Sequence, residues 1–174
     1  MRIHVTGASG SGTSTLGAAL AARLGYLHLD ADDYYWIPTT PPFTTKRAAP
    51  ERLSRVLADL NSSEDSILAG SIVGWGAELE NCFDLIVFLY VEADVRVERL
   101  KKRELELFGH ANPAFLEWAA QYDEGLLEGR SLAKHRAWLA ARTCPVVEIR
   151  GVHAVDDLVA LVLRAANKES REMP

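Results

Sequence analysis

The sequence lacks the features of a secreted or membrane-embedded protein. It contains two cysteines, Cys82 and Cys144, which form no CxxC pair, so neither a disulfide framework nor a thiolate metal site is expected. Its longest apolar run, residues 85–91, is far shorter than the roughly 20 residues that span a membrane. The N-terminal residues alternate in polarity like a strand and have no apolar signal stretch. We therefore expect a soluble, cytoplasmic protein.

An excess of positive charge is also missing. Lys and Arg number 19 and Asp and Glu number 24, which gives a formal net charge of −5. Bulk attraction to nucleic acid or to an anionic membrane surface is therefore not expected. With 174 residues, of which 48% are hydrophobic, the chain suits one compact domain over residues 1–174. A monomer is compatible with these numbers, and the oligomeric state stays open.

Apolar strand patterns alternate with helical patterns along the chain. Strands are predicted at residues 2–6, 26–30, 67–69, 85–91 and 146–149, with helical periodicity between them. Residues 34–50, which hold four of the seven prolines, are predicted to be irregular and partly extended. This order predicts an α/β fold of three α/β/α layers around a five-stranded, mostly parallel sheet. In such folds ligands bind beyond the carboxyl ends of the strands.

A glycine-rich loop follows the first predicted strand and opens a helix. Its GxxxxG frame is typical of a phosphate-binding loop, because glycines and a helix N-terminus direct backbone N–H groups toward an anion. The candidate phosphate-binding residues are Gly7, Ala8, Ser9, Gly10, Ser11, Gly12, Thr13, Ser14 and Thr15. Ser14 stands where the motif supplies a hydroxyl to Mg²⁺, whereas Thr13 replaces the motif's phosphate-binding lysine. The alternative is a turn that only caps a helix.

Three carboxylates follow the second predicted strand. Asp30 and Asp32 share one face while the chain stays extended, because side chains alternate with period two. One could hold Mg²⁺ while the other orients or deprotonates an acceptor hydroxyl, and Asp33 is a second candidate for the acceptor. The alternative is N-capping of a short helix. The aromatic residues at 34–36 suit either stacking on a planar acceptor or anchoring of the proline-rich loop.

Arginines recur after the fourth predicted strand. Arg96, Arg99 and Arg103 fall at i, i+3 and i+7, so they are predicted to line one helix face. Clustered guanidinium groups suit the oxygens of a transferring phosphoryl group. The alternative, equally weighted, is a solvated face with ion pairs to nearby glutamates.

The segment 109–144 is long for a connection within a domain, and such segments are often lids. Gly125 and Gly129 are candidate hinges, and Arg130 follows them at a predicted helix start, where a cation gains nothing from the helix dipole. We therefore expect Arg130 to face a ligand. His135 is expected to be a packing or surface histidine instead of a general base.

With these features in this order, the chain resembles the P-loop kinases of the nucleoside monophosphate kinase fold. It is most similar to the small bacterial proteins called adenylate kinase-like or topology-modulation proteins. The blocks that carry the likeness are HLDADDYYW, PPFTTKR, GSIVGWG, FLEWAAQYD and EGRSLAKHRAWL. The resemblance implies one P-loop kinase-like domain over residues 1–174, with an acceptor-binding region at about 31–60 and a helical lid at about 104–144.

The resemblance also implies roles for single residues. Similarity to adenylate kinases gives Arg99 a nucleotide-stacking role and Arg103 a phosphate contact, whereas Glu104 stands where that family has a second arginine. The spacing of Asp30 and Asp32 looks like the DxD of shikimate and gluconate kinases, in which the first Asp serves Mg²⁺ and the second serves the acceptor hydroxyl. The acceptor is accordingly a nucleoside monophosphate or a small hydroxylated metabolite.

The sequence thus favours an ATP- and Mg²⁺-dependent phosphotransferase with a nucleotide and a small acceptor as partners. Residues 7–15 would bind the donor phosphates, and Ser14 and Asp30 would serve Mg²⁺. The expected catalytic residues are Asp32, Arg99, Arg103 and Arg130, which position the acceptor and neutralise developing charge. The competing hypothesis, motivated by Thr13, is a nucleotide-binding regulatory protein with little turnover. A nucleic-acid-processing factor is disfavoured by the acidic net charge.

Overall fold

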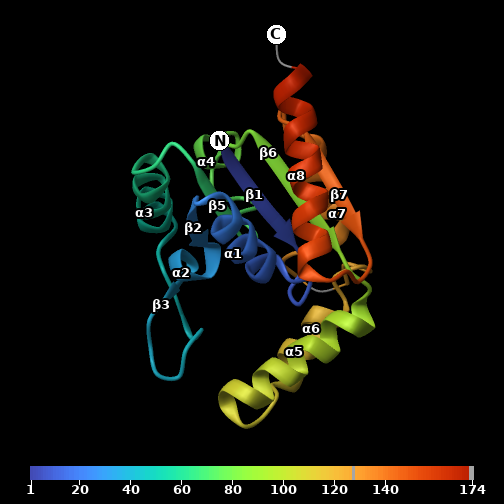
Figure 1. Ribbon diagram of the computed structural model, residues 1–174. Helices are drawn as coiled ribbons and strands as arrows, with labels where there is room; N and C mark the ends of the chain where they lie inside the picture. The colour runs from blue at the N-terminus through green and yellow to red at the C-terminus, as the bar shows by residue number, and fades with distance from the viewer. Residues whose placement is uncertain (127, 173–174) are drawn as a thin grey trace.

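A computed structural model of the protein describes residues 1–126 and 128–172, and describes side chains through residue 167. Leu127, in the predicted lid, lies outside the described residues. The main sheet contains β1 (Arg2–Gly7), β2 (Leu27–Asp30), β5 (Ser66–Ala69), β6 (Leu85–Tyr90) and β7 (Val146–Arg150). Its strand order is β2-β5-β1-β6-β7 and every pairing is parallel (Figure 1). The prediction of a five-stranded, mostly parallel sheet is confirmed.

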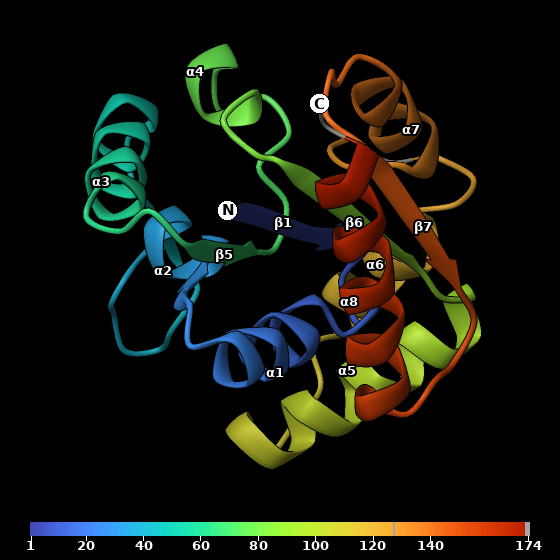
Figure 2. The ribbon, with the colours of Figure 1, turned by 45° about the horizontal axis from the view of Figure 1, so that its top comes forward.

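Helices cover both faces of this sheet. One face carries α1 (Thr13–Leu24) and α8 (Val155–Glu172), and the other carries α3 (Ala49–Asn61), α4 (Ala77–Glu80) and α7 (Leu132–Ala140) (Figure 2). Alternate residues of β6 feed the two cores: Val87 packs with α1 and α8, whereas Phe88 packs with α3 and α7. The predicted three-layer α/β/α architecture is therefore confirmed.

The central strand β1 alternates apolar and polar residues, although all of them after Arg2 are buried. Ile3 and Val5 join the core beneath α1 and α8. His4 and Thr6 are fully buried, and period-two alternation turns them toward the opposite face. There His4 Nδ1 hydrogen-bonds the Leu68 carbonyl at 2.9 Å, and Thr6 Oγ1 hydrogen-bonds His135 Nε2 of α7 at 2.9 Å. Polar groups of β1 thus connect the strand that leads into the glycine-rich loop with α7.

The proline-rich segment is more ordered than predicted. It contains a two-stranded antiparallel hairpin of β3 (Trp36–Ile37) and β4 (Thr45–Lys46), which Figure 1 shows extending beyond α2 (Ala31–Tyr35). Buried Arg47 holds it, because its Nε donates to the Tyr34 carbonyl at 3.0 Å and its Nη1 binds Glu51 at 2.9 Å. The partly extended chain that the prolines predict is present, and the prediction of an irregular segment was wrong only for the paired residues of β3 and β4.

Two further helices, α5 (Ala93–Phe108) and α6 (Pro113–Ala120), lie together beyond the carboxyl ends of the strands (Figure 1). Glu104 fixes the turn between them, since its Oε2 accepts from the Asn112 N–H at 2.6 Å. Glu104 is buried and serves this turn, although it stands where adenylate kinases have a second arginine. None of the helices in the described part of the chain is long and apolar enough to cross a membrane.

Candidate functional site

The glycine-rich loop forms a tight cradle at the carboxyl end of β1. A Cβ added to Gly7 would lie 2.5 Å from Ser11 Oγ and 2.6 Å from the Leu89 carbonyl oxygen. Gly10 has φ +83°, and a Cβ there would lie 2.6 Å from the Arg96 carbonyl oxygen. Both positions therefore need glycine, one for space and one for space and conformation.

Helix α1 begins at Thr13, directly after this loop. Its N-cap, Gly12, is left-handed and forms no side-chain capping bond, so side chains do not occupy the first amides of the helix. Buried Ser11 Oγ has no hydrogen-bond partner within the described residues. Unpaired amides, a helix N-terminus and an orphaned hydroxyl at one place suit a bound phosphate. Ser14 and Thr15 are exposed at the same helix start.

The acidic residues after β2 differ in their local structure. The strand ends at Asp30, whose Oδ1 accepts from the Asp32 N–H at 3.0 Å and so caps α2. The expectation that Asp30 and Asp32 share an extended face is wrong, because the chain turns helical at Ala31. The capping alternative holds for Asp30, while Asp32 and Asp33 lie exposed on the first turn of α2.

Asp32 interacts electrostatically with two arginines that are distant in sequence. Desolvation raises the pKa of its carboxyl group, the negative charge of Asp30 adds to this, and the positive charges of Arg130 and Arg103 oppose it. Two of the predicted catalytic arginines therefore lie within electrostatic range of the third predicted catalytic residue, Asp32. A carboxylate with a raised pKa is also a better proton acceptor.

The predicted arginine row on α5 divides into two parts. Arg96, Leu100 and Glu104 are the buried positions of this helix, at i, i+4 and i+8. Arg96 points inward, so the prediction that it shares one ligand-facing cluster with Arg99 and Arg103 was wrong. Those two arginines are exposed and form no ion pair with any described residue, and Arg99 Nη1 donates to the Gly10 carbonyl at 3.3 Å. The ion-pair alternative does not apply to them.

A pocket of about 170 Å³ lies beside the phosphate loop. Leu16, Leu89 and Leu158 supply apolar lining, and Arg99 and His153 also line it. Loop residues, among them Ser11 and Gly12, form another part of the wall. An apolar slot with a guanidinium beside it suits the planar base of a nucleotide whose phosphates lie in the loop.

The segment that carries Arg130 is fastened at its base. The Leu132 N–H donates to the Tyr122 carbonyl at 2.8 Å, and the Tyr122 hydroxyl hydrogen-bonds His135 Nδ1 at 2.8 Å. Arg130 itself lies over the Trp118 ring at 5.4 Å. Burial lowers the pKa of His135 to about 4, so this histidine is neutral near pH 7. Its role as a packing residue is confirmed.

Sequence reasoning missed a cluster around Arg52 of α3. The Arg52 guanidinium of α3 lies 4.2 Å from the Trp75 ring centroid and 5.0 Å from that of Tyr35. Its Nε is buried without a partner, and Arg52 forms no ion pair with the residues that the structure describes. No spacing in the sequence links positions 35, 52 and 75, so only the fold reveals this group.

Glu80 joins the loop that contains Trp75 to α7. Its Oε1 accepts from the Trp75 N–H at 2.9 Å and the Gly76 N–H at 3.3 Å. Its Oε2 accepts from Trp138 Nε1 of α7 at 2.7 Å. The sequence marked neither Glu80 nor this connection.

A magnesium ion would find a small donor set near the loop. Within the described ranges no group of three His, Cys, Asp or Glu residues could hold a metal alone. Mg²⁺ is usually bound by one or two carboxylates together with phosphate oxygens and water. The Ser14 hydroxyl, the second oxygen of Asp30 and the Asp32 carboxylate are hard oxygen donors of this type.

Comparison with known proteins identifies the family and the fold of the chain. A family model described as an AAA domain, AAA_18, matches residues 3–107. The chain belongs to this AAA-domain family. This AAA-domain protein is 45% identical over 171 residues to the uncharacterized protein YqaC of Bacillus subtilis (strain 168), with 92% of this chain and 94% of YqaC covered. It is 32% identical over 122 residues to a cytidylate kinase of Haloarcula marismortui, with 64% and 62% of the two chains covered.

Solved structures resemble the AAA-domain chain over nearly its full length. Shikimate kinase from Acinetobacter baumannii, in complex with shikimate, gives a TM-score of 0.61 at 20% identity and covers 99% of this chain and 95% of that one. Deoxyadenosine kinase from M. mycoides, with bound dATP, gives 0.60 at 17% identity and covers 96% and 99%. The AAA-domain chain thus has the P-loop kinase fold, as the resemblance of its sequence to the P-loop kinases predicted.

Proposed function

We propose that this protein is an ATP-binding phosphotransferase that transfers the γ-phosphoryl group to a small acceptor. The observation that carries the proposal is the position of Asp32 within electrostatic range of Arg103 and Arg130, at the sheet edge that holds the phosphate loop. A carboxylate for the acceptor and cations for the transferred group are the parts that phosphoryl transfer needs. Kinases among the relatives and structural neighbours support it.

The donor side would bind the nucleotide. Amides of residues 7–15 and the orphaned Ser11 hydroxyl would bind phosphate oxygens, and the base would occupy the pocket beside Arg99. Ser14 and Asp30 would hold Mg²⁺, which supplies charge neutralisation on the phosphates when bound. In this proposal residues 1–174 act as one cytoplasmic domain on small molecules, with the acceptor region at about 31–60 and the lid at about 104–144.

The acceptor side would orient the attacking oxygen. Asp32 would accept the proton of an acceptor hydroxyl as that oxygen bonds to phosphorus and ADP leaves. Arg99, Arg103 and Arg130 would neutralise charge on the transferred group. The unpaired Arg52 favours an acceptor with an anionic group, a property shared by nucleoside monophosphates and hydroxylated carboxylic acids.

One observation favours a second candidate, a nucleotide-binding regulatory protein with little turnover. Thr13 occupies the position of the motif's lysine, and the described ion pairs and hydrogen bonds bring no other lysine to the loop. Removal of one preorganised electrostatic donor can cost about 3 kcal/mol of transition-state stabilisation. Such a protein would bind ATP and turn it over slowly with every acceptor.

The test is ADP release from ATP and Mg²⁺ in the presence of single acceptors. The panel contains the nucleoside monophosphates, hydroxylated carboxylic acids and neutral polyols. The kinase proposal expects a rise of at least about a hundredfold over basal hydrolysis with one anionic acceptor. A flat panel with calorimetrically measurable ATP binding supports the regulatory candidate, and no binding of ATP or GTP at millimolar concentration overturns both.

A further inference from the structure

Arg96 is a buried cation at the junction of the site's segments. Its side chain is 1% exposed, and it is one of the largest fully buried side chains in the described chain. A charged group is seldom buried to this degree unless it is paired and hydrogen-bonded. Arg96 satisfies this condition with groups from three separate segments.

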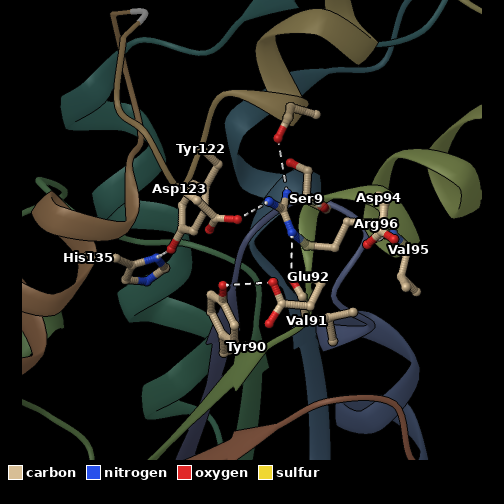
Figure 3. Close-up of polar contacts among 11 residues, drawn as sticks. Ser9, Tyr90, Val91, Glu92, Asp94, Val95, Arg96, Tyr122, Asp123 and His135 are labelled. Atoms are coloured by element: carbon tan, nitrogen blue, oxygen red, sulfur yellow. Dashed lines mark hydrogen bonds and ion pairs between the residues drawn. The ribbon is translucent and has the colours of Figure 1, made fainter.

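These contacts radiate from one guanidinium (Figure 3). Nε donates to the Val91 carbonyl at the end of β6 at 2.8 Å. Nη1 donates to the Ala119 carbonyl of α6 at 3.1 Å and to the Ser9 carbonyl of the phosphate loop at 3.4 Å. Nη2 pairs with Asp123 Oδ2 at 3.4 Å, and the guanidinium lies 5.1 Å from the Tyr122 ring centroid.

The bond to Ser9 affects the loop's orientation. In a trans peptide the carbonyl oxygen and the following N–H point in opposite directions. Because Arg96 binds the Ser9 oxygen, the Gly10 N–H points away from Arg96. Arg99, one turn along α5, holds the next carbonyl in the same way. Consecutive loop carbonyls are thus bound by arginines from one helix.

The bonds to Ala119 and Asp123 affect the segment that carries Arg130. Tyr122 lies between these contacts, and its carbonyl accepts from the Leu132 N–H, which closes the base of the segment. The Tyr122 hydroxyl also bonds His135, which bonds Thr6 of β1, one residue before the loop (Figure 3 shows the Tyr122–His135 bond). Arg96 therefore binds the phosphate loop and the base of the Arg130 segment at once.

We infer that Arg96 is a positioning residue that holds the phosphate loop and the segment carrying Arg130 in one fixed relation. The inference rests on the proposed function for its consequence, since both parts would face the same transferring phosphoryl group. An arginine suits this task because its planar group carries five donors, whereas a lysine ammonium is a point charge with three donors. Methionine at this position would fill space and release both parts.

The first experiment compares Arg96→Met with Arg142→Met. Arg142 is a matched control: its side chain is also nearly buried, it donates to two carbonyls, pairs with a carboxylate and lies over a tryptophan. It contacts neither the phosphate loop nor residues 119–123. In amide hydrogen exchange we expect Arg96→Met to raise exchange of residues 8–12 and 119–126 by about tenfold or more, and Arg142→Met to leave both unchanged.

The second experiment measures ATP affinity by calorimetry well below each variant's melting temperature. We expect Arg96→Met to weaken binding by about tenfold and Arg96→Lys by less, with Arg142→Met within about twofold of wild type. If the methionine variant does not fold, the exchange pattern of Arg96→Lys decides in its place. A lowered melting temperature with wild-type exchange at residues 8–12 overturns the inference. Wild-type protein that binds no nucleotide overturns the proposed function, while the exchange result still decides the role of Arg96.

Discussion

The proposed donor side and the proposed acceptor side of the site differ in the contacts that their arginines make. On the donor side, Arg96 and Arg99 already bind carbonyls of the phosphate loop. On the acceptor side, Arg52 lies against two aromatic rings and has no ion pair among the described residues. Protein groups thus preorganise the donor site, whereas the acceptor site keeps unsatisfied charge. Under the proposed function, we therefore expect acceptor binding to depend more on the ligand's own charge than nucleotide binding does.

Substitution of Asp32 should give the largest difference between the effect on kcat and the effect on ATP affinity. Asp32→Asn keeps the shape of the side chain and removes the proton acceptor, so we expect kcat to fall by about a hundredfold or more. ATP affinity should stay within about twofold, because the phosphate loop is not changed. Steady-state kinetics with the best acceptor and calorimetry with ATP measure the two effects. Asp33→Asn, on the same helical turn, tests the second candidate for the acceptor, and wild-type kcat in Asp32→Asn would remove Asp32 from the mechanism.

Acid should lower the free energy of unfolding through two buried histidines, His135 and His4. Burial lowers the pKa of His135 to about 4 and that of His4 to about 3, both below their ordinary value of 6.5. Protons therefore bind these histidines more tightly in the unfolded chain than in the folded protein. The free energy of unfolding is accordingly not reduced by them above about pH 6.5 and falls as the pH drops toward 4. The loss amounts to about 3 kcal/mol per histidine across that range.

Denaturant unfolding at pH 7 and pH 5 measures this loss. His135→Gln should reduce the difference between the two pH values, because glutamine does not titrate. The exposed His110 provides the control variant, since His110→Gln leaves the buried groups in place. An unchanged pH dependence in His135→Gln would contradict the assignment of the effect to this residue.

Removal of the Arg52 charge should have the smallest of these effects, a change in KM for the acceptor. Arg52→Met keeps the apolar contact with Trp75 and removes the charge, so KM for the anionic acceptor should rise by about tenfold while KM for ATP stays unchanged. Arg55→Met is a matched control on the same helix, because Arg55 is exposed and already paired with Glu51 at 3.0 Å. An equal rise of both KM values would show that the two sides are not separable in this way.

Local patterns in the sequence were enough to predict the main fold and the phosphate loop. Strand alternation and a GxxxxG frame are short-range signals, and the structure contains both features where they were expected. The missed features depend on contacts distant in sequence. The β3–β4 hairpin has strands of two residues each and is held by Arg47, which no periodicity reveals.

Arg96 shows a different limit of sequence reasoning. Its spacing with Leu100 and Glu104, at i, i+4 and i+8, marks the buried stripe of α5, but two of these three residues are charged. Charged residues are expected on an accessible face, so the sequence alone predicts a row that faces either a ligand or solvent. Their partners, Asp123 for Arg96 and the Asn112 amide for Glu104, lie in segments that only the fold brings near.

Glu80 binds both the loop that contains Trp75 and helix α7. A single carboxylate holds the amides of Trp75 and Gly76 with one oxygen and the indole of Trp138 with the other. Displacement of Trp75 would therefore break a bond to the carboxylate that also binds α7, the helix that follows Arg130. Under the proposed function, a ligand bound at Trp75 and the position of Arg130 are connected through this one carboxylate.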